Sequence, residues 1–105
     1  MSEYILAIST CPENEAESLA RILVESKLCA CVNLIQNVFS IYHWKGRIEE
    51  EKEAILLMKT RKDLENKLFS VLKEHHSYEV PEFIVLSIDS GSDNYLKWIG
   101  ESTSL

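Results

Sequence analysis

Apolar and polar positions follow two different periods along this chain. Residues 4–9 and 83–88 are short apolar runs with β-branched side chains, which predict buried strands. Residues 13–27 instead carry apolar side chains at the i, i+3, i+4 and i+7 positions of a helix, namely Ala16, Leu19, Ala20 and Leu23. This spacing predicts a helix with a single apolar stripe, and such a helix packs on one face only.

Helical spacing returns in the second half of the chain. A second apolar stripe predicts a helix that ends near His75, and it consists of Leu64, Leu68, Val71 and Leu72. The first helix is expected to begin next to Thr10 or Cys11, with Pro12 at its first position. A short closing helix is expected over residues 94–99.

Between the two longer helices the chain is strand-like over residues 29–44 and again over residues 48–60. Lys45 and Gly46 predict a two-residue turn, because glycine readily adopts the positive φ that tight hairpin turns need. The turn sets a definite register, with Tyr42 opposite Glu49, Ser40 opposite Glu51 and Val38 opposite Glu53. The acidic run at residues 49–53 is expected to be a solvated strand edge, with collection of cations as the alternative.

The order of these elements is β-α-β-β-α-β followed by a terminal helix. It predicts an α+β, ferredoxin-like fold, in which an antiparallel sheet carries two helices on one face. No repeat or linker divides the chain, so residues 1–105 are expected to form a single domain.

The central hairpin is long for a domain of this size. Residues 30–44 would extend about 50 Å as a strand, whereas a domain of about 100 residues is roughly 35 Å across. The distal hairpin is apolar or aromatic on both faces, and we expect further copies of the chain to cover it in a closed symmetric assembly. A bulge near Gln36 and Asn37 that folds the hairpin back is the alternative.

Charge and composition limit the possible binding partners and the expected location of the protein. The 105 residues include 11 Lys and Arg against 17 Asp and Glu, a net charge of −6, which disfavours nucleic acid as a partner. No apolar run approaches the roughly 20 residues of a membrane span. Residues 1–4 lack a basic start typical of a signal peptide, so a cytoplasmic location is expected. Three cysteines, an odd number, are expected to be thiols.

Several segments resemble a known family in order and spacing. They are ACVNLI at 30–35, SIYHWKGRI at 40–48, KT at 59–60, YEVPE at 78–82 and YLKW at 95–98. Together they are similar to the CutA divalent-cation (copper) tolerance family, essentially from end to end. The resemblance implies a non-enzymatic homotrimer with a ferredoxin-like fold, closed by the long hairpins, and it places Tyr42 and Trp44 at the subunit interface.

The resemblance also implies a metal site. Copper-binding members of the family use an adjacent histidine pair before the Tyr-x-x-Pro-Glu segment, and His75 and His76 occupy these positions here. The family cysteine near the end of the first strand is replaced by Ser9, so Cys11 is the candidate third ligand for copper or another divalent cation. Ser77 stands where proline is common. The alternatives are that the histidines simply complement a helix C-terminus and that Cys11 is inert.

A second group of residues is implied to lie near the clefts between subunits: Lys59, Tyr78, Glu79, Glu82 and Trp98. Such a mixed polar and aromatic group suits a small-ligand pocket, with interface packing as the alternative. The competing function is therefore a ligand-binding signalling or scaffold trimer that resembles the nitrogen-regulatory signalling proteins. The tight turn at Lys45 and Gly46 replaces their long mobile loop, which disfavours nucleotide sensing. No catalytic motif is present in the sequence, so no enzyme is expected.

Overall fold

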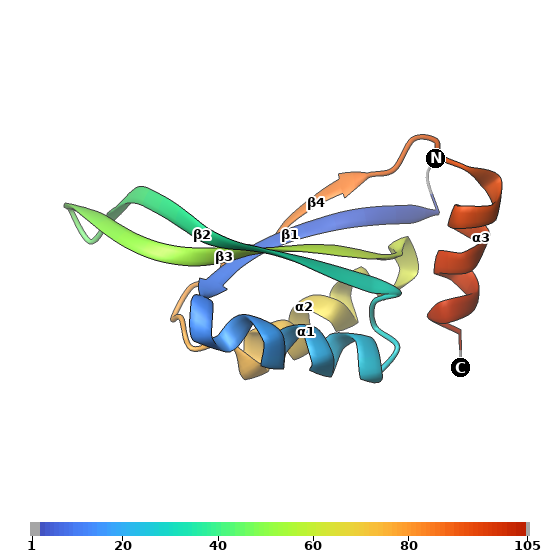
Figure 1. Ribbon diagram of the computed structural model, residues 1–105, viewed down its shortest axis with the longest axis horizontal. Helices are drawn as coiled ribbons and strands as arrows, with labels where there is room; N and C mark the ends of the chain where they lie inside the picture. The colour runs from blue at the N-terminus through green and yellow to red at the C-terminus, as the bar shows by residue number, and fades with distance from the viewer. Residues whose placement is uncertain (1–2, 105) are drawn as a thin grey trace.

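The computed structural model describes residues 3–104 as a four-stranded antiparallel sheet with two helices on one face (Figure 1). The strands are β1 (Tyr4–Pro12), β2 (Cys31–Trp44), β3 (Arg47–Arg61) and β4 (Ile84–Ser87), and they lie in the order β2-β3-β1-β4. The helices are α1 (Ala16–Glu25), α2 (Glu65–His75) and α3 (Asp93–Ser102), with short 3-10 turns at Glu13–Glu15 and Lys62–Leu64. The predicted ferredoxin-like α+β fold with a C-terminal helix is confirmed.

The core lies between the sheet and helices α1 and α2. Alternate residues of β1 are buried, as expected for a strand with one face against helices. Ala7 and Cys11 of β1 pack there with residues of the other elements, among them Leu19, Leu23, Leu56, Met58, Leu68 and Leu72. Within residues 3–104, no helix is long and apolar enough to cross a membrane.

The opposite face of the sheet is also apolar, and we call it the outer face. The strand pairing places Leu6 beside Leu86, and it places Ile8 between Leu57 and Ile84. Helix α3 reaches only one end of this face, where Lys59 and Arg61 of β3 bond to its Tyr95 and to Thr103 just after it. Ile84 and Leu86 are 50% and 48% exposed. A large apolar surface therefore faces outward in the single chain.

The beginning of α1 differs from the prediction. Thr10 and Cys11 belong to β1, which pairs with β3 as far as Pro12 opposite Glu53, and α1 begins at Ala16. Strand β1 continues to Pro12 because β3 continues beside it and pairs with it. The helix-start signals at Thr10, Cys11 and Pro12 are local, so they do not indicate this pairing with a distant strand. The helix ends at Glu25, before Lys27, whose φ of 64° is incompatible with a continued right-handed helix.

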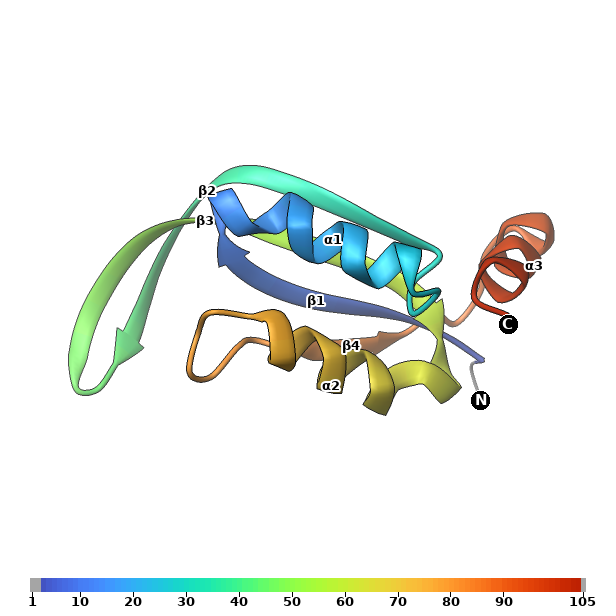
Figure 2. The ribbon, with the colours of Figure 1, turned by 90° about the horizontal axis from the view of Figure 1, so that it is seen from below.

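The hairpin follows the predicted register. Lys45 and Gly46 have φ of 51° and 78°, and Tyr42, Ser40 and Val38 lie opposite Glu49, Glu51 and Glu53. The register shifts between Ile35 and Val38, where Asn37 has φ of 61°, so the bulge also exists. The distal hairpin bends toward the side of α2 and still protrudes from a molecule whose longest dimension is 44 Å (Figure 2). The hairpin both bends and projects.

Candidate functional site

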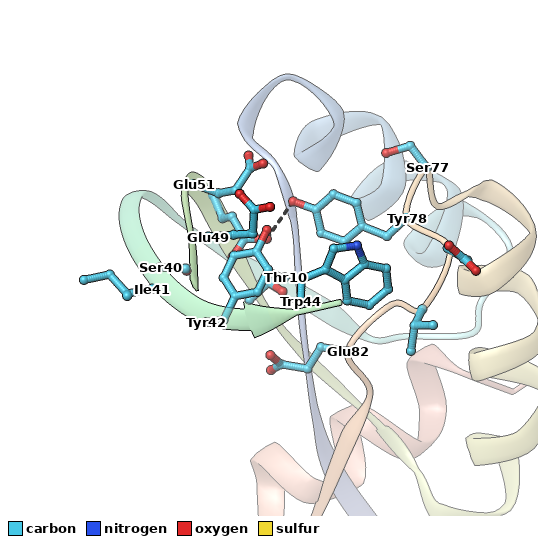
Figure 3. Close-up of a pocket in the computed structure, with 13 residues that line it drawn as sticks. Thr10, Ser40, Ile41, Tyr42, Trp44, Glu49, Glu51, Ser77, Tyr78 and Glu82 are labelled. Atoms are coloured by element: carbon cyan, nitrogen blue, oxygen red, sulfur yellow. Dashed lines mark hydrogen bonds between the residues drawn. The ribbon is translucent and has the colours of Figure 1, made fainter. Parts of the chain in front are cut away.

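A hollow of about 780 Å³ lies between the bent hairpin and the loop that follows α2 (Figure 3). We call it the hairpin pocket. The hairpin contributes Ser40, Tyr42, Trp44, Glu49, Glu51 and Glu53 to its lining, and the loop contributes Ser77, Tyr78, Glu79, Val80 and Glu82. Figure 3 shows the rings of Trp44 and Tyr78 directed into the space between hairpin and loop. The pocket is thus built mainly from two segments far apart in the sequence, and Thr10 of β1 completes its lining.

The strand period explains why the carboxylates gather here. Glu49, Glu51 and Glu53 are alternate residues of β3, and alternate side chains of a strand share a face. Their partners on β2 include Tyr42, which sits opposite Glu49. The bulge then bends this face of the hairpin over the loop. The acidic run is therefore not simply a solvated edge, because Glu53 is only 5% exposed and all three glutamates line the pocket.

The floor of the pocket is held by one short hydrogen bond. Tyr78 Oη donates to Glu53 Oε2 at 2.7 Å. Burial, and then this hydrogen bond, raises the pKa of Tyr78 above its ordinary value. Burial followed by the charge of Glu53 raises the pKa of Glu82. Loss of solvation and the charges of Glu51, Glu53 and Glu49 raise the pKa of Tyr42. Carboxylates thus lie close enough to Tyr42 and Glu82 for their charge to add to the effect of burial.

His76 positions the loop. Its Nε2 lies 2.7 Å from the carbonyl oxygen of Thr10, and its Nδ1 lies 3.0 Å from the backbone nitrogen of Tyr78. Because a carbonyl only accepts and a backbone N–H only donates, these partners assign the tautomer with the proton on Nε2. The ring also packs against Tyr78, with centroids 4.8 Å apart. The buried His76 thus has a structural task that the sequence did not reveal.

The other predicted metal ligands lie apart from this arrangement. His75, at the exposed end of α2, donates from Nδ1 to the carbonyl of Val71 at 3.0 Å, which leaves the Nε2 lone pair available. Cys11 is fully buried, and burial, followed by the charges of Glu15 and Glu53, raises the pKa of its thiol to about 11. Cys11 lies within β1, whereas the sequence predicted that it would lie next to the start of the first helix, so it does not gain the lowered thiol pKa that a helix N-terminus provides.

Within a single chain, the described residues do not assemble a metal centre. Among residues 3–104, no group of three His, Cys, Asp or Glu side chains is placed to hold a metal ion. Both ring nitrogens of His76 already have protein partners, and the Cys11 thiol is protonated at neutral pH. His75, His76 and Cys11 therefore do not fit a closed site within a single subunit.

The predicted cleft residues form two groups. Tyr78, Glu79 and Glu82 line the hairpin pocket. Lys59 lies elsewhere, with its Nζ 3.3 Å from Tyr95 Oη, and the Tyr95 and Trp98 rings are 5.3 Å apart. Lys59 is six positions after Glu53 on β3, a span of about 20 Å. Within one chain, Lys59 and Trp98 thus do not join the other three.

Replacing Tyr78 with phenylalanine is expected to lower the free energy of unfolding by about 1.5 to 3 kcal/mol, because a carboxylate would lose its hydrogen-bond donor in a buried setting. Urea denaturation of both proteins measures the difference. Tyr95→Phe is the matched control, since it removes an exposed hydroxyl bonded to Lys59 and should change stability by less than about 0.5 kcal/mol. Equal effects of the two changes would contradict the role given to the Glu53 bond.

Comparison with known proteins gives a consistent result. The chain matches the CutA1 divalent ion tolerance protein family over residues 5–102. It is 47% identical over 96 residues to a CutA homolog of Xenopus laevis, covering 90% of this chain and 64% of that protein. The chain spans 55 to 64% of the length of the first curated relatives it matches.

Solved structures agree with the fold. CutA from Xylella fastidiosa superimposes with a TM-score of 0.95 at 36% identity, covering 98% of this chain and 100% of that chain. A protein from Nostoc described as PII-like protein CutA, in apo form, gives a TM-score of 0.91 at 37% identity, covering 96% of this chain and 98% of that one. By sequence and by fold, this chain belongs to the CutA1 divalent ion tolerance protein family.

Proposed function

We propose that this chain acts as a non-enzymatic homotrimer in tolerance to divalent metal ions, with copper or a similar ion as its ligand. The observation that carries the proposal is the apolar outer face of the sheet in a chain whose family is named for divalent ion tolerance. A cytoplasmic location and the absence of nucleic-acid binding stay predictions from the sequence.

The uncovered surfaces support association. Ile84 and Leu86 on the outer face are half exposed, and so are Phe39, Ile41 and Ile48 on the distal hairpin. Soluble proteins rarely leave such apolar areas in water. The distal part of β3 also pairs only with β2, which leaves a strand edge open. A closed ring of identical subunits covers both features without open-ended growth.

For the metal, His75 is the ligand we place first. Its Nε2 is accessible, whereas His76 has to release Thr10 and Tyr78 before it can coordinate an ion. Cys11 has to lose a proton in a buried position. Imidazole nitrogen favours Cu(II) among the divalent first-row ions. A closed site would then draw further ligands from a second subunit.

Replacing His75 with alanine is expected to weaken Cu(II) binding at least about tenfold. Mutation of a residue that only hydrogen-bonds a metal ligand commonly costs this much metal affinity, and loss of a direct ligand should cost no less. Titration calorimetry of the assembled protein measures this, with His43→Ala as the matched loss of another exposed histidine. Binding should also weaken in acid, because a protonated imidazole cannot coordinate. Cys11→Ser should change little. Wild-type affinity in His75→Ala would contradict the assignment.

The hairpin pocket favours a second candidate function, a ligand-binding signalling or scaffold trimer. A volume of about 780 Å³ falls within the range of small-molecule sites, and the pocket combines aromatic walls with polar groups. A solved relative from Nostoc is described as PII-like. Titration with a panel of small metabolites tests this function, and a panel without any binding would argue against it.

A further inference from the structure

The bulge of the hairpin is held by a side chain from another element. The register of β2 against β3 shifts between Ile35 and Val38, so the residues between them have no regular opposite partner. One of them, Asn37, has φ of 61°, a backbone conformation that asparagine tolerates better than most residues. Its backbone N–H donates to Glu13 Oε2 at 3.1 Å. A carboxylate 24 residues earlier in the chain therefore contacts the point at which the hairpin bends.

Glu13 reaches the bulge because β1 continues to Pro12. Pro12 lies opposite Glu53, the residue of β3 that also pairs with Val38. Glu13 is the next residue, and it begins the 3-10 turn that leads into α1. Strand β3 lies between β1 and β2, so two strand spacings, or about 10 Å, separate the end of β1 from β2. A long side chain is needed to cross this distance.

A second contact meets the hairpin beside the same bulge. Glu53 pairs with Val38, the first paired residue after the bulge, and it accepts a hydrogen bond from Tyr78 Oη at 2.7 Å. Farther out, Lys45 Nζ lies 3.7 Å from Glu79, but both side chains are exposed and such ion pairs contribute little. The bend toward the side of α2 (Figure 2) therefore depends on contacts at the base of the distal hairpin, from the start of α1 and from the loop after α2.

We infer that Glu13 is a positioning residue that fixes the direction in which the hairpin bends, and thereby holds the wall that carries Trp44 over the loop that carries Tyr78 (Figure 3). Glu13 does not line the hairpin pocket itself. Glu13 and Asn37 belong to the same chain, so each subunit of the assembly can make this contact. The inference goes beyond the proposed function, because it depends on no metal ion and on no ligand.

Amide hydrogen exchange of Asn37 in the assembled protein measures the contact. Glu13→Ala removes the acceptor and should speed exchange of this amide about tenfold, as expected for a lost hydrogen bond to a charged group. Glu13→Gln keeps an oxygen at the same reach and should retain most of the protection. Glu17→Ala is the matched control, because Glu17 is an exposed glutamate of α1 that bonds Arg21 and not the hairpin. It should leave the Asn37 amide unchanged.

The fluorescence of Trp44 reports the position of the hairpin. The chain has two tryptophans, so Trp44 is the remaining one in a Trp98→Phe background. Glu13→Ala should shift the native emission of Trp44, and Glu13→Gln should restore it. A carboxylate that only adds stability would lower the unfolding midpoint but would leave the native emission as it is. The two variants therefore separate positioning from simple stabilisation.

Three results would overturn the inference. They are wild-type exchange of the Asn37 amide in Glu13→Ala, equal effects of Glu13→Ala and Glu17→Ala, and an unchanged Trp44 emission after the Asn37 protection is lost. The last result would mean that Tyr78 or a neighbouring subunit sets the bend. If Glu13→Ala does not fold, Glu13→Asp replaces it, since aspartate keeps the charge but is one methylene shorter. Wild-type protection of Asn37 in Glu13→Asp would likewise contradict the role given to Glu13.

Discussion

Leu86→Lys is expected to reduce the native mass from three times 12.1 kDa to that of one chain. Leu86 is 48% exposed in the isolated chain, so a lysine there can reach water in a monomer. In a trimer that buries the outer face, each subunit would instead bury an unpaired ammonium group beside Leu6, which costs several kcal/mol. Light scattering at micromolar concentration measures the mass.

Val24→Lys is the matched control for this change. Val24 is 40% exposed, but it lies on α1, away from the outer face, so its replacement should leave the mass at three subunits. A trimer that persists with lysine at position 86 would show that the outer face is not the contact. A wild-type protein that is monomeric would contradict the assembly altogether.

Trp44→Ala should destabilise the assembly by about 3 to 5 kcal/mol per subunit, the usual cost of truncating a buried aromatic side chain. In the single chain Trp44 is 36% exposed, with Lys45 Nζ 5.6 Å from the ring centre. The full cost therefore depends on coverage by another subunit. Denaturant unfolding at several protein concentrations measures it, because the stability of an oligomer depends on concentration.

His43→Ala provides the comparison on the same strand. His43 is the exposed neighbour of Trp44 and points to the other side of the hairpin, so its loss should cost less than about 0.5 kcal/mol. A similarly small effect for Trp44→Ala would mean that the hairpin tip is solvated in the native protein, and Tyr42 and Trp44 would then not be interface residues.

The hairpin shows how far local information reaches in this protein. Lys45 and Gly46 specify the turn. Once the turn is set, strand pairing places Tyr42 opposite Glu49 and allows no other register. The same alternation placed Glu49, Glu51 and Glu53 on one face, so the acidic wall of the pocket was present in the sequence. The register does not specify the direction in which the bulge at Asn37 bends this face of the hairpin.

The sequence by itself determined the order of the elements, the turn and the register, because these depend on side-chain periodicity and on φ preferences of neighbouring residues. Tertiary structure decided that β1 runs on to Pro12, that His76 bonds to Thr10 and that Tyr78 bonds to Glu53. It also separated Lys59 from the pocket. These contacts join residues far apart in the chain, and they exist only after the sheet has closed and the hairpin has bent over the loop that follows α2.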